Sequence, residues 1–337
     1  MIPPLTPTFD AALRDVRAED PRFRVAAAAR LAEPPTERRE TAVRGLLSLA
    51  EDPSGVVRGA AYEALGLLGA VEGLSLLLEA FDDPHAEARQ AAVLAVGRIA
   101  PDRGAEALAA LLGDDRPEMR FASIWTLSSL GRAHASTIVN ALGDRDAEVR
   151  LLALQCLSDL EAFEHADAMT RLLDDPVDGV RFGAATSLAA LGDARGAATL
   201  RTALHRADRA LPAAIGLGDL ADHDSRSELR RLAKHRWRSP ILRAAAARAL
   251  VRLGDPLGTE VIRRLVRSWR IEARQYAVQL VGELQLTALL PDIALALKRS
   301  RKAERPVYEA TLEQLASQSD EAGALLASIR IANHPGP

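Results

Sequence analysis

The sequence predicts an all-α protein built as a solenoid, a linear stack of about ten two-helix repeats of roughly 31 residues each. Three observations predict this fold class. Of the 337 residues, 48% are hydrophobic but only 4% are aromatic, which favours helices packed through small side chains. An arginine recurs along the chain at nearly constant spacing, and an Ala/Leu pattern of helical period follows it. A compact core rarely grows to this size, so we expect one repeat domain over residues 1–337.

A column of nine arginines marks the repeats: Arg24, Arg58, Arg89, Arg120, Arg150, Arg181, Arg243, Arg274 and Arg305. Neighbouring members are 30, 31 or 34 residues apart, except for a gap of 62 residues between Arg181 and Arg243. Because that gap is twice 31, it contains one further repeat, whose column position is predicted at Pro212. Ten repeats therefore cover nearly the whole chain.

Each repeat is predicted to hold a first helix, a turn and a second helix. The turns carry Asp-Pro pairs, for example Asp52-Pro53, with Asp expected as the N-cap and Pro at the first helical position. The second helix contains the arginine and ends at a glycine such as Gly69, the expected C-cap. Helices of this length are marginal alone in water, so stacking must stabilise them.

These features together resemble the HEAT-repeat superfamily, in particular the short repeats of phycobilisome lyases. The matching residues are the column arginines, the Ala/Leu spacing after them and the turn aspartates Asp52, Asp83, Asp114, Asp144 and Asp175, over roughly residues 18–320. The resemblance implies a right-handed superhelix whose second helices line the concave side. It says little about function, because the superfamily includes scaffolds, transport adaptors, lyase subunits and DNA glycosylases.

Repetition of the turn aspartate and the column arginine indicates a structural role rather than a binding site. An arginine one turn into the helix can reach the aspartate or the carbonyl groups of a neighbouring turn. The predicted structural ladder comprises Asp52, Arg58, Asp83, Arg89, Arg120, Arg150, Asp175 and Arg181.

One departure from the repeat pattern is an apolar stripe on the second helices. Counting from the column arginine as zero, positions 3, 6 and 7 are small or apolar, so positions 1 and 5 should point outward. They are small or polar in ordinary repeats, as at Gly59 and Glu63, but in repeats three to six they become Leu94, Phe121, Trp125, Leu151 and Phe182. Exposed side chains of this kind are typical of a protein interface, whereas inward-facing ones would only fill gaps between helices.

A second departure is a basic ridge in the turns of the last four repeats. The residue six positions before the column is Asp in repeats two to six and then becomes Arg206, Trp237, Ser268 and Arg299. We define the ridge as Arg206, Arg209, Arg236, Trp237, Arg238, Arg267, Trp269, Arg270 and Arg299. Arginines beside aromatic rings suit an acidic protein surface, single-stranded nucleic acid or anionic lipid headgroups. A merely solvated basic face would have the same composition.

The charge of the chain changes sign along its length. Residues 1–200 carry a formal net charge of −11 and residues 201–337 one of +8, which distinguishes acidic repeats (18–200) from basic repeats (201–320). Binding of an anionic partner to the basic repeats follows as a hypothesis, and so does head-to-tail self-association of the two ends.

No pattern in the sequence predicts catalysis, a metal or a cofactor. The seven histidines include no His-x-x-x-His pair, and Cys156 lies at a position where other repeats have Ala or Ser. The start, MIPPLTPTFD, lacks the basic and apolar regions of a signal peptide, and no apolar run has the roughly 18 residues that a membrane span needs. With one cysteine, the chain is expected to be cytoplasmic.

The predicted function is therefore that of an interaction scaffold or adaptor, not an enzyme. Its partner is expected to be another protein, held by the apolar stripe and the basic ridge. The alternatives are a nucleic-acid-binding solenoid, including a DNA-glycosylase-like protein, and a bilin-lyase-like subunit. The glycosylase match is poor because Trp125 lies in the acidic half rather than on a cationic face.

Overall fold

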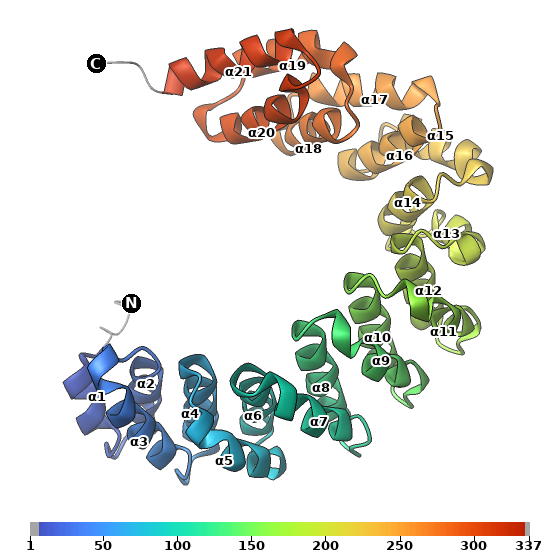
Figure 1. Ribbon diagram of the computed structural model, residues 1–337. Helices are drawn as coiled ribbons and strands as arrows, with labels where there is room; N and C mark the ends of the chain where they lie inside the picture. Colours follow the sequence, from blue (N-terminus) through green and yellow to red (C-terminus); the bar gives the residue numbers. More distant parts are fainter. Residues whose placement is uncertain (1–6, 334–337) are drawn as a thin grey trace. The chain divides into compact units, whose positions relative to one another are not determined.

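The computed structural model describes residues 7–333, and all regular elements within that range are helices (Figure 1). The predicted all-α solenoid is confirmed. Contacts between residues divide the chain into two compact units, an N-terminal unit of residues 1–169 and a C-terminal unit of residues 170–337. Residues 1–6, on which part of the signal-peptide argument rests, lie outside the described residues. Between residues 7 and 333, none of the helices combines the length and apolar character that crossing a bilayer requires.

In the N-terminal unit, the second helices of successive repeats pack against one another, and each also packs against its own first helix (Figure 1). The first helices are α1 (Phe9–Asp15), α3 (Arg39–Leu49), α5 (Leu74–Glu79), α7 (Pro101–Leu111) and α9 (Ala135–Ile138), and the second helices are α2 (Pro21–Leu31), α4 (Gly55–Leu68), α6 (Ala86–Ile99), α8 (Pro117–Ser129) and α10 (Ala147–Asp159). Short 3-10 turns lead into or extend several of the first helices. Helix α11 (Ala166–Thr170) contains the division between the units.

The C-terminal unit repeats the same plan. Its first helices after α11 are α13 (Ala197–Ala203), α15 (Arg226–Lys234), α17 (Pro256–Val266) and α19 (Leu290–Lys298), and its second helices are α12 (Asp178–Ala190), α14 (Ala210–Asp219), α16 (Pro240–Arg252), α18 (Ile271–Glu283) and α20 (Arg305–Ala316). A further helix, α21 (Asp320–Asn333), packs on α19 and α20. Ten second helices thus match the ten predicted repeats within the described part of the chain.

Small residues allow neighbouring second helices to approach closely. A Cβ atom added to Gly66 of α4 would lie 2.8 Å from the Cα atom of Ala95 in α6. A Cβ atom on Gly218 of α14 would lie equally close, 2.8 Å, to the Cα atom of Ala249 in α16. Real Cβ atoms do not come so near a backbone, so a larger residue would push the helices apart and open the packed core.

Most of the described second helices, but not α2, α6 or α20, are followed by a residue with positive φ. Gly69 adopts φ 63° after α4, and the N–H of the next residue donates to the carbonyl oxygen of Leu65, which closes a Schellman motif. The predicted role of Gly69 as a C-cap is confirmed. The same left-handed position is filled by Glu161, Ala221 and Gln285 in other repeats, although residues with a Cβ atom disfavour that conformation.

The predicted position of the seventh repeat is wrong by two residues. In the eighth repeat, the left-handed residue Gly254 lies eleven positions after the column residue Arg243. In the seventh repeat Ala221 takes that conformation, which places the column at Ala210 rather than at Pro212. Because this repeat has no column arginine, the sequence contained no marker of its register. The spacing between Arg181 and Arg243 alone does not reveal that the column of the seventh repeat lies two residues earlier.

The predicted capping role of the turn aspartates is also wrong. Helix α4 begins at Gly55, and its N-cap is Ser54. Asp52 lies before the helix, where its Oδ1 accepts a hydrogen bond of 2.8 Å from the N–H of Ser54. This is an Asx turn, in which the side chain bonds to the backbone two residues on. Asp83 and Asp175 accept equivalent bonds, so the following prolines lie in the turn and not at the first helical position.

The aspartate instead receives the arginine of the preceding repeat. Arg58 donates from Nε and from Nη2 to the two carboxylate oxygens of Asp83, at 2.7 Å and 2.6 Å, while its Nη1 donates to the carbonyl oxygen of Asp52 at 2.8 Å. Arg120 makes the same bonds to Asp144 and to the carbonyl oxygen of Asp114. Each guanidinium therefore ties its own turn to the next one, and two-point pairing of this kind is strong and specific in geometry.

Candidate partner-binding sites

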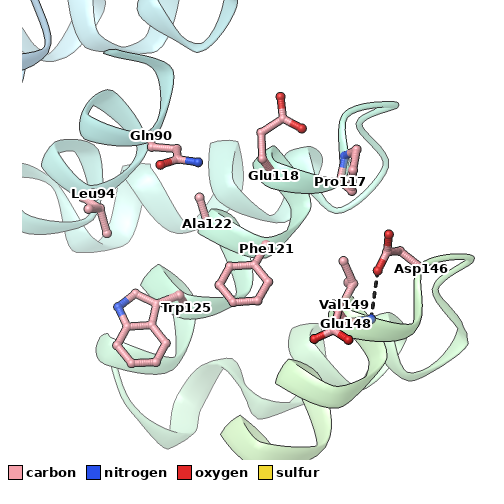
Figure 2. Close-up of a pocket in the computed structure, with 10 residues that line it drawn as sticks. All are labelled: Gln90, Leu94, Pro117, Glu118, Phe121, Ala122, Trp125, Asp146, Glu148 and Val149. Carbon is pink, nitrogen blue, oxygen red and sulfur yellow. Dashed lines mark hydrogen bonds between the residues drawn. The ribbon is translucent and has the colours of Figure 1, made fainter. Parts of the chain in front are cut away.

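A groove of 590 Å³ opens on the N-terminal unit, over α6, α8 and the start of α10 (Figure 2). The residues that line it are Gln90, Leu94, Pro117, Glu118, Phe121, Ala122, Trp125, Asp146, Glu148 and Val149. Its volume lies within the range of sites that hold small ligands or a few side chains of a partner.

Three residues of the apolar stripe contribute to the apolar part of this groove, together with Pro117, Ala122 and Val149. Leu94 projects from α6, and Phe121 and Trp125 project one turn apart from α8 (Figure 2). Their exposed fractions are 38%, 42% and 57%, although water disfavours contact with such side chains. The predicted outward orientation of these three side chains is thus observed. This orientation follows from the helical period. The residues at positions 3, 6 and 7 of α6 and α8 are buried in the core, so positions 1 and 5 face outward.

The rim of the groove is acidic. Glu118, Asp146 and Glu148 line it, and no lysine or arginine is among its lining residues. The backbone N–H of Glu118, followed by Arg89 at 2.9 Å, lowers the pKa of the Glu118 carboxyl, so this side chain is charged at neutral pH. Asp146 caps α10 by accepting from the N–H of Glu148. The groove therefore presents an apolar floor with carboxylates on one side.

The other two residues of the apolar stripe do not line the groove. Leu151 is half-buried on α10. Phe182 belongs to α12 in the C-terminal unit, where the guanidinium carbon of Arg209 lies 4.9 Å from its ring centroid. Sequence reasoning missed the acidic rim, because its members lie at the starts of α8 and α10 rather than on the predicted stripe. A cluster of carboxylates just after two turns was the signal that could have identified it.

The basic ridge is partly neutralised within the protein. Arg206 and Arg209 both bind Asp178, at 2.7 Å and 2.8 Å, and Arg267 binds Asp292 at 2.5 Å. Arg206 also does not replace the turn aspartate as predicted, because the corrected register puts Leu204 at that position. A cation bound to a carboxylate of its own chain contributes less to the attraction of a ligand.

The remaining ridge residues are open to solvent. Trp237 and Trp269 each have 82% of their surface exposed, and the guanidinium groups of Arg236 and Arg270 lie over their rings at 5.2 Å and 5.4 Å from the centroids. Ridge arginines without a carboxylate partner among the described residues are Arg236, Arg238, Arg270 and Arg299. These four cations and two indole rings are the part of the ridge that is available to a partner.

The structure also places the cysteine considered from the sequence and the candidate metal-ligand residues. Cys156 is buried in α10, and burial raises the pKa of its thiol, which favours the unreactive protonated form. Within residues 7–333, no three His, Cys, Asp or Glu side chains converge as metal ligands would.

The fold is a repeat solenoid whose two units expose apolar and basic side chains. The family model for HEAT repeats matches residues 9–96, 74–138 and 135–212, which together span more than half of the chain. The chain therefore belongs to the HEAT-repeat family. HEAT-repeat proteins generally act as protein-interaction scaffolds and are generally non-enzymatic.

One solved structure agrees with this fold, and a second is similar with a lower TM-score. The X-ray structure of YibA from E. coli is 19% identical, with a TM-score of 0.56 over 72% of this chain and 92% of its own. The crystal structure of an engineered protein is 18% identical, with a TM-score of 0.49 over 91% of this chain and 98% of its own. No curated protein matches the sequence significantly.

Proposed function

We propose that this chain is a non-enzymatic interaction scaffold whose groove on the N-terminal unit holds a short segment of a partner protein. The segment presents two or three apolar side chains to Leu94, Phe121 and Trp125 and carries lysine or arginine beside them. The basic ridge of the C-terminal unit holds an anionic part of a partner. The observation that carries the proposal is the exposure of Phe121 and Trp125 inside a formed groove.

The chemistry of the groove supports a cationic, amphipathic segment. Aromatic side chains in a well-formed depression are frequent hot spots, whose truncation costs about 2 kcal/mol or more of binding free energy. Carboxylates at the rim attract basic residues and repel acidic ones, which selects among partners of equal hydrophobicity.

Replacing both aromatic residues of the groove tests the proposal. The tagged protein is used to capture partners from the lysate of its own cells, and bound proteins are quantified by mass spectrometry. We expect Phe121→Ala with Trp125→Ala to reduce recovery of the main partner about tenfold or more. Because neither side chain belongs to the buried core, thermal unfolding should change much less than it would for a core substitution.

The matched control is Phe163→Ala in the same unit. Phe163 is also exposed, at 52%, but does not line the groove. We expect this variant to keep the partner. Equal recovery with the double variant and the wild-type protein would refute the groove as the binding site, and a large drop in melting temperature would show that the two rings are needed for folding.

A nucleic-acid-binding solenoid is the second candidate, favoured by the two exposed tryptophans with stacked arginines. Ion pairing of Arg206, Arg209 and Arg267 within the chain speaks against a continuous track for phosphates. Nuclease treatment distinguishes the two candidates in the same capture. The nucleic-acid function is supported if nuclease removes the recovered proteins and if the logarithm of the binding constant falls linearly with the logarithm of the salt concentration.

A further inference from the structure

Three column arginines of the N-terminal unit, Arg24, Arg58 and Arg120, bind the turn aspartate of the next repeat. Arg89 instead binds Glu118 and leaves its Nε without a partner, because Asp114 is bound by Arg116. In the N-terminal unit, the Nε–Nη2 edge of Arg58 faces the two oxygens of Asp83, and that of Arg120 faces Asp144 in the same way. These carboxylates come from the position six residues before the next column arginine. A half-buried or buried guanidinium thus receives a planar anion at that position.

The turn of the tenth repeat lacks this carboxylate. Arg299 replaces the turn aspartate that Arg274 would bind. Arg274 donates from Nη1 to the carbonyl oxygen of Ser268 at 2.8 Å and from Nη2 to Glu304 at 2.5 Å, but its Nε has no hydrogen-bond partner. Only 10% of the Arg274 side chain is exposed. A buried donor without an acceptor is costly, so an added anion would be favourable here.

A cavity of 240 Å³ lies beside this guanidinium in the C-terminal unit. It is lined by Val266, Arg267, Ser268, Trp269, Arg274, Leu295, Ala296 and Arg299. Three of these residues are arginines and none is acidic. The nearby carboxylates, Asp292 and Glu304, are already bound by Arg267 and Arg274. Ser268 accepts the N–H of Arg270, which leaves its hydroxyl hydrogen free to donate.

We propose that this cavity binds one carboxylate side chain, an Asp or Glu of an acidic protein segment, in place of the missing ladder aspartate. Arg299 provides the charge, the unpartnered Nε of Arg274 and the hydroxyl of Ser268 provide donors, and the indole of Trp269 covers the apolar stem of the side chain. The proposal deepens the function proposed for the basic ridge by naming the chemical group that it recognises.

Size and geometry favour a carboxylate over a nucleotide. The cavity is smaller than the roughly 300 Å³ at which pockets for larger ligands begin, so it has room for a side chain and not for a base with its sugar and phosphate. Elsewhere in this chain the same guanidinium edge is filled by a planar, two-oxygen anion.

The test is binding of a fluorescein-labelled, capped oligoglutamate peptide to the full chain at low salt, followed by fluorescence anisotropy. We expect saturable binding that Arg299→Gln weakens about tenfold, because one charge-assisted contact is lost. The control is Arg238→Gln, which removes another unpaired ridge arginine that does not line the cavity. It should change the affinity less than twofold. No binding, or equal weakening by both variants, overturns the proposal.

A second variant separates local recognition from general charge. Arg299→Asp restores the ladder carboxylate, so we expect it to raise the melting temperature and to abolish peptide binding together. If binding and melting temperature both match those of the wild-type protein, the cavity is not the site. Competition is measured with inorganic phosphate and with oligothymidylate. Displacement by either at a lower concentration than unlabelled oligoglutamate overturns the assignment of a carboxylate.

These outcomes are independent of the capture experiment. If the peptide does not bind but Phe121 and Trp125 are necessary for capture, only the proposal of the carboxylate site is refuted. If the Phe121→Ala, Trp125→Ala variant captures the partner normally while the peptide binds as expected, the proposed function of the groove is refuted. The carboxylate site is not affected by that result.

Discussion

The carboxylate of Asp144 illustrates how single residues hold neighbouring repeats together. Burial alone would raise the pKa of Asp144, but hydrogen bonds from Arg120 and from the N–H of Asp146 outweigh it and lower the pKa. The bound Arg120 has only 3% of its side chain exposed. Removing one partner of such a pair leaves an uncompensated buried charge, which is more damaging than losing a surface contact.

Asp144→Asn is therefore expected to lower the free energy of unfolding by about 3 kcal/mol, measured by urea denaturation. The control is Asp115→Asn, which removes an ion pair with Arg145 whose aspartate is fully exposed. We expect no measurable change from the control, because exposed pairs contribute little. Similar losses for the two variants would show that burial does not govern the ladder.

The sign of the pH dependence follows from the same residue. Because the folded-state pKa of Asp144 is depressed, its stabilising contribution is present above the unfolded pKa of about 4 and is lost as pH falls through the folded value. The melting temperature of the Asp144→Asn variant should accordingly fall less than that of the wild-type protein as pH is lowered. Melting curves between about pH 6 and pH 3 measure this difference.

At the scale of the helix, some left-handed caps are formed by residues that disfavour positive φ. Ala221 and Gln285 occupy the conformation that Gly69 and Gly254 fill elsewhere. A Cβ atom costs roughly 1 kcal/mol there. Nothing lies within 4 Å of a Cβ atom added to Gly69, so steric contact with neighbours would not add to that cost.

We expect Ala221→Gly and Gln285→Gly each to raise the free energy of unfolding by up to about 1 kcal/mol, and Gly69→Ala to lower it by a similar amount. Denaturant titration of the three variants measures both directions. If both glycine substitutions destabilise the protein, the added freedom of the unfolded chain exceeds the relief of backbone strain.

Helical periodicity predicted most of this element-scale structure. The ten second helices and the outward positions of Phe121 and Trp125 follow from a 3.6-residue period, which depends only on local sequence. The register of α14 did not follow, because that repeat lacks the arginine that marks the column. The N-caps were misplaced for another reason: an aspartate suits an Asx turn as well as a cap, and the choice depends on the arginine that reaches it from the preceding repeat.

For the molecule as a whole, charge divides according to the two units. The N-terminal unit has 17 Arg and 27 Asp or Glu, a net charge of −10, and the C-terminal unit has 26 Lys or Arg and 19 Asp or Glu, a net charge of +7. Opposite net charges on two parts of one chain favour contact between different molecules when salt is low.

We expect concentration-dependent self-association at low ionic strength that physiological salt largely abolishes, measured by sedimentation velocity over a series of salt and protein concentrations. The reversal Arg236→Glu with Arg270→Glu removes four units of charge difference from the open part of the ridge and should reduce the association. A monomer at every concentration in low salt would exclude this use of the two charged units.

Periodicity along a single helix was enough to predict a stack of helical repeats and to identify Leu94, Phe121 and Trp125 as outward residues. Which charged side chains lack a partner within the chain depends on how the repeats pack. Arg267 and Asp292 are 25 residues apart, and so are Arg58 and Asp83. Such partners meet only when one repeat packs on the next, so the paired arginines, the acidic rim of the groove and the unpartnered Nε of Arg274 all depend on stacking.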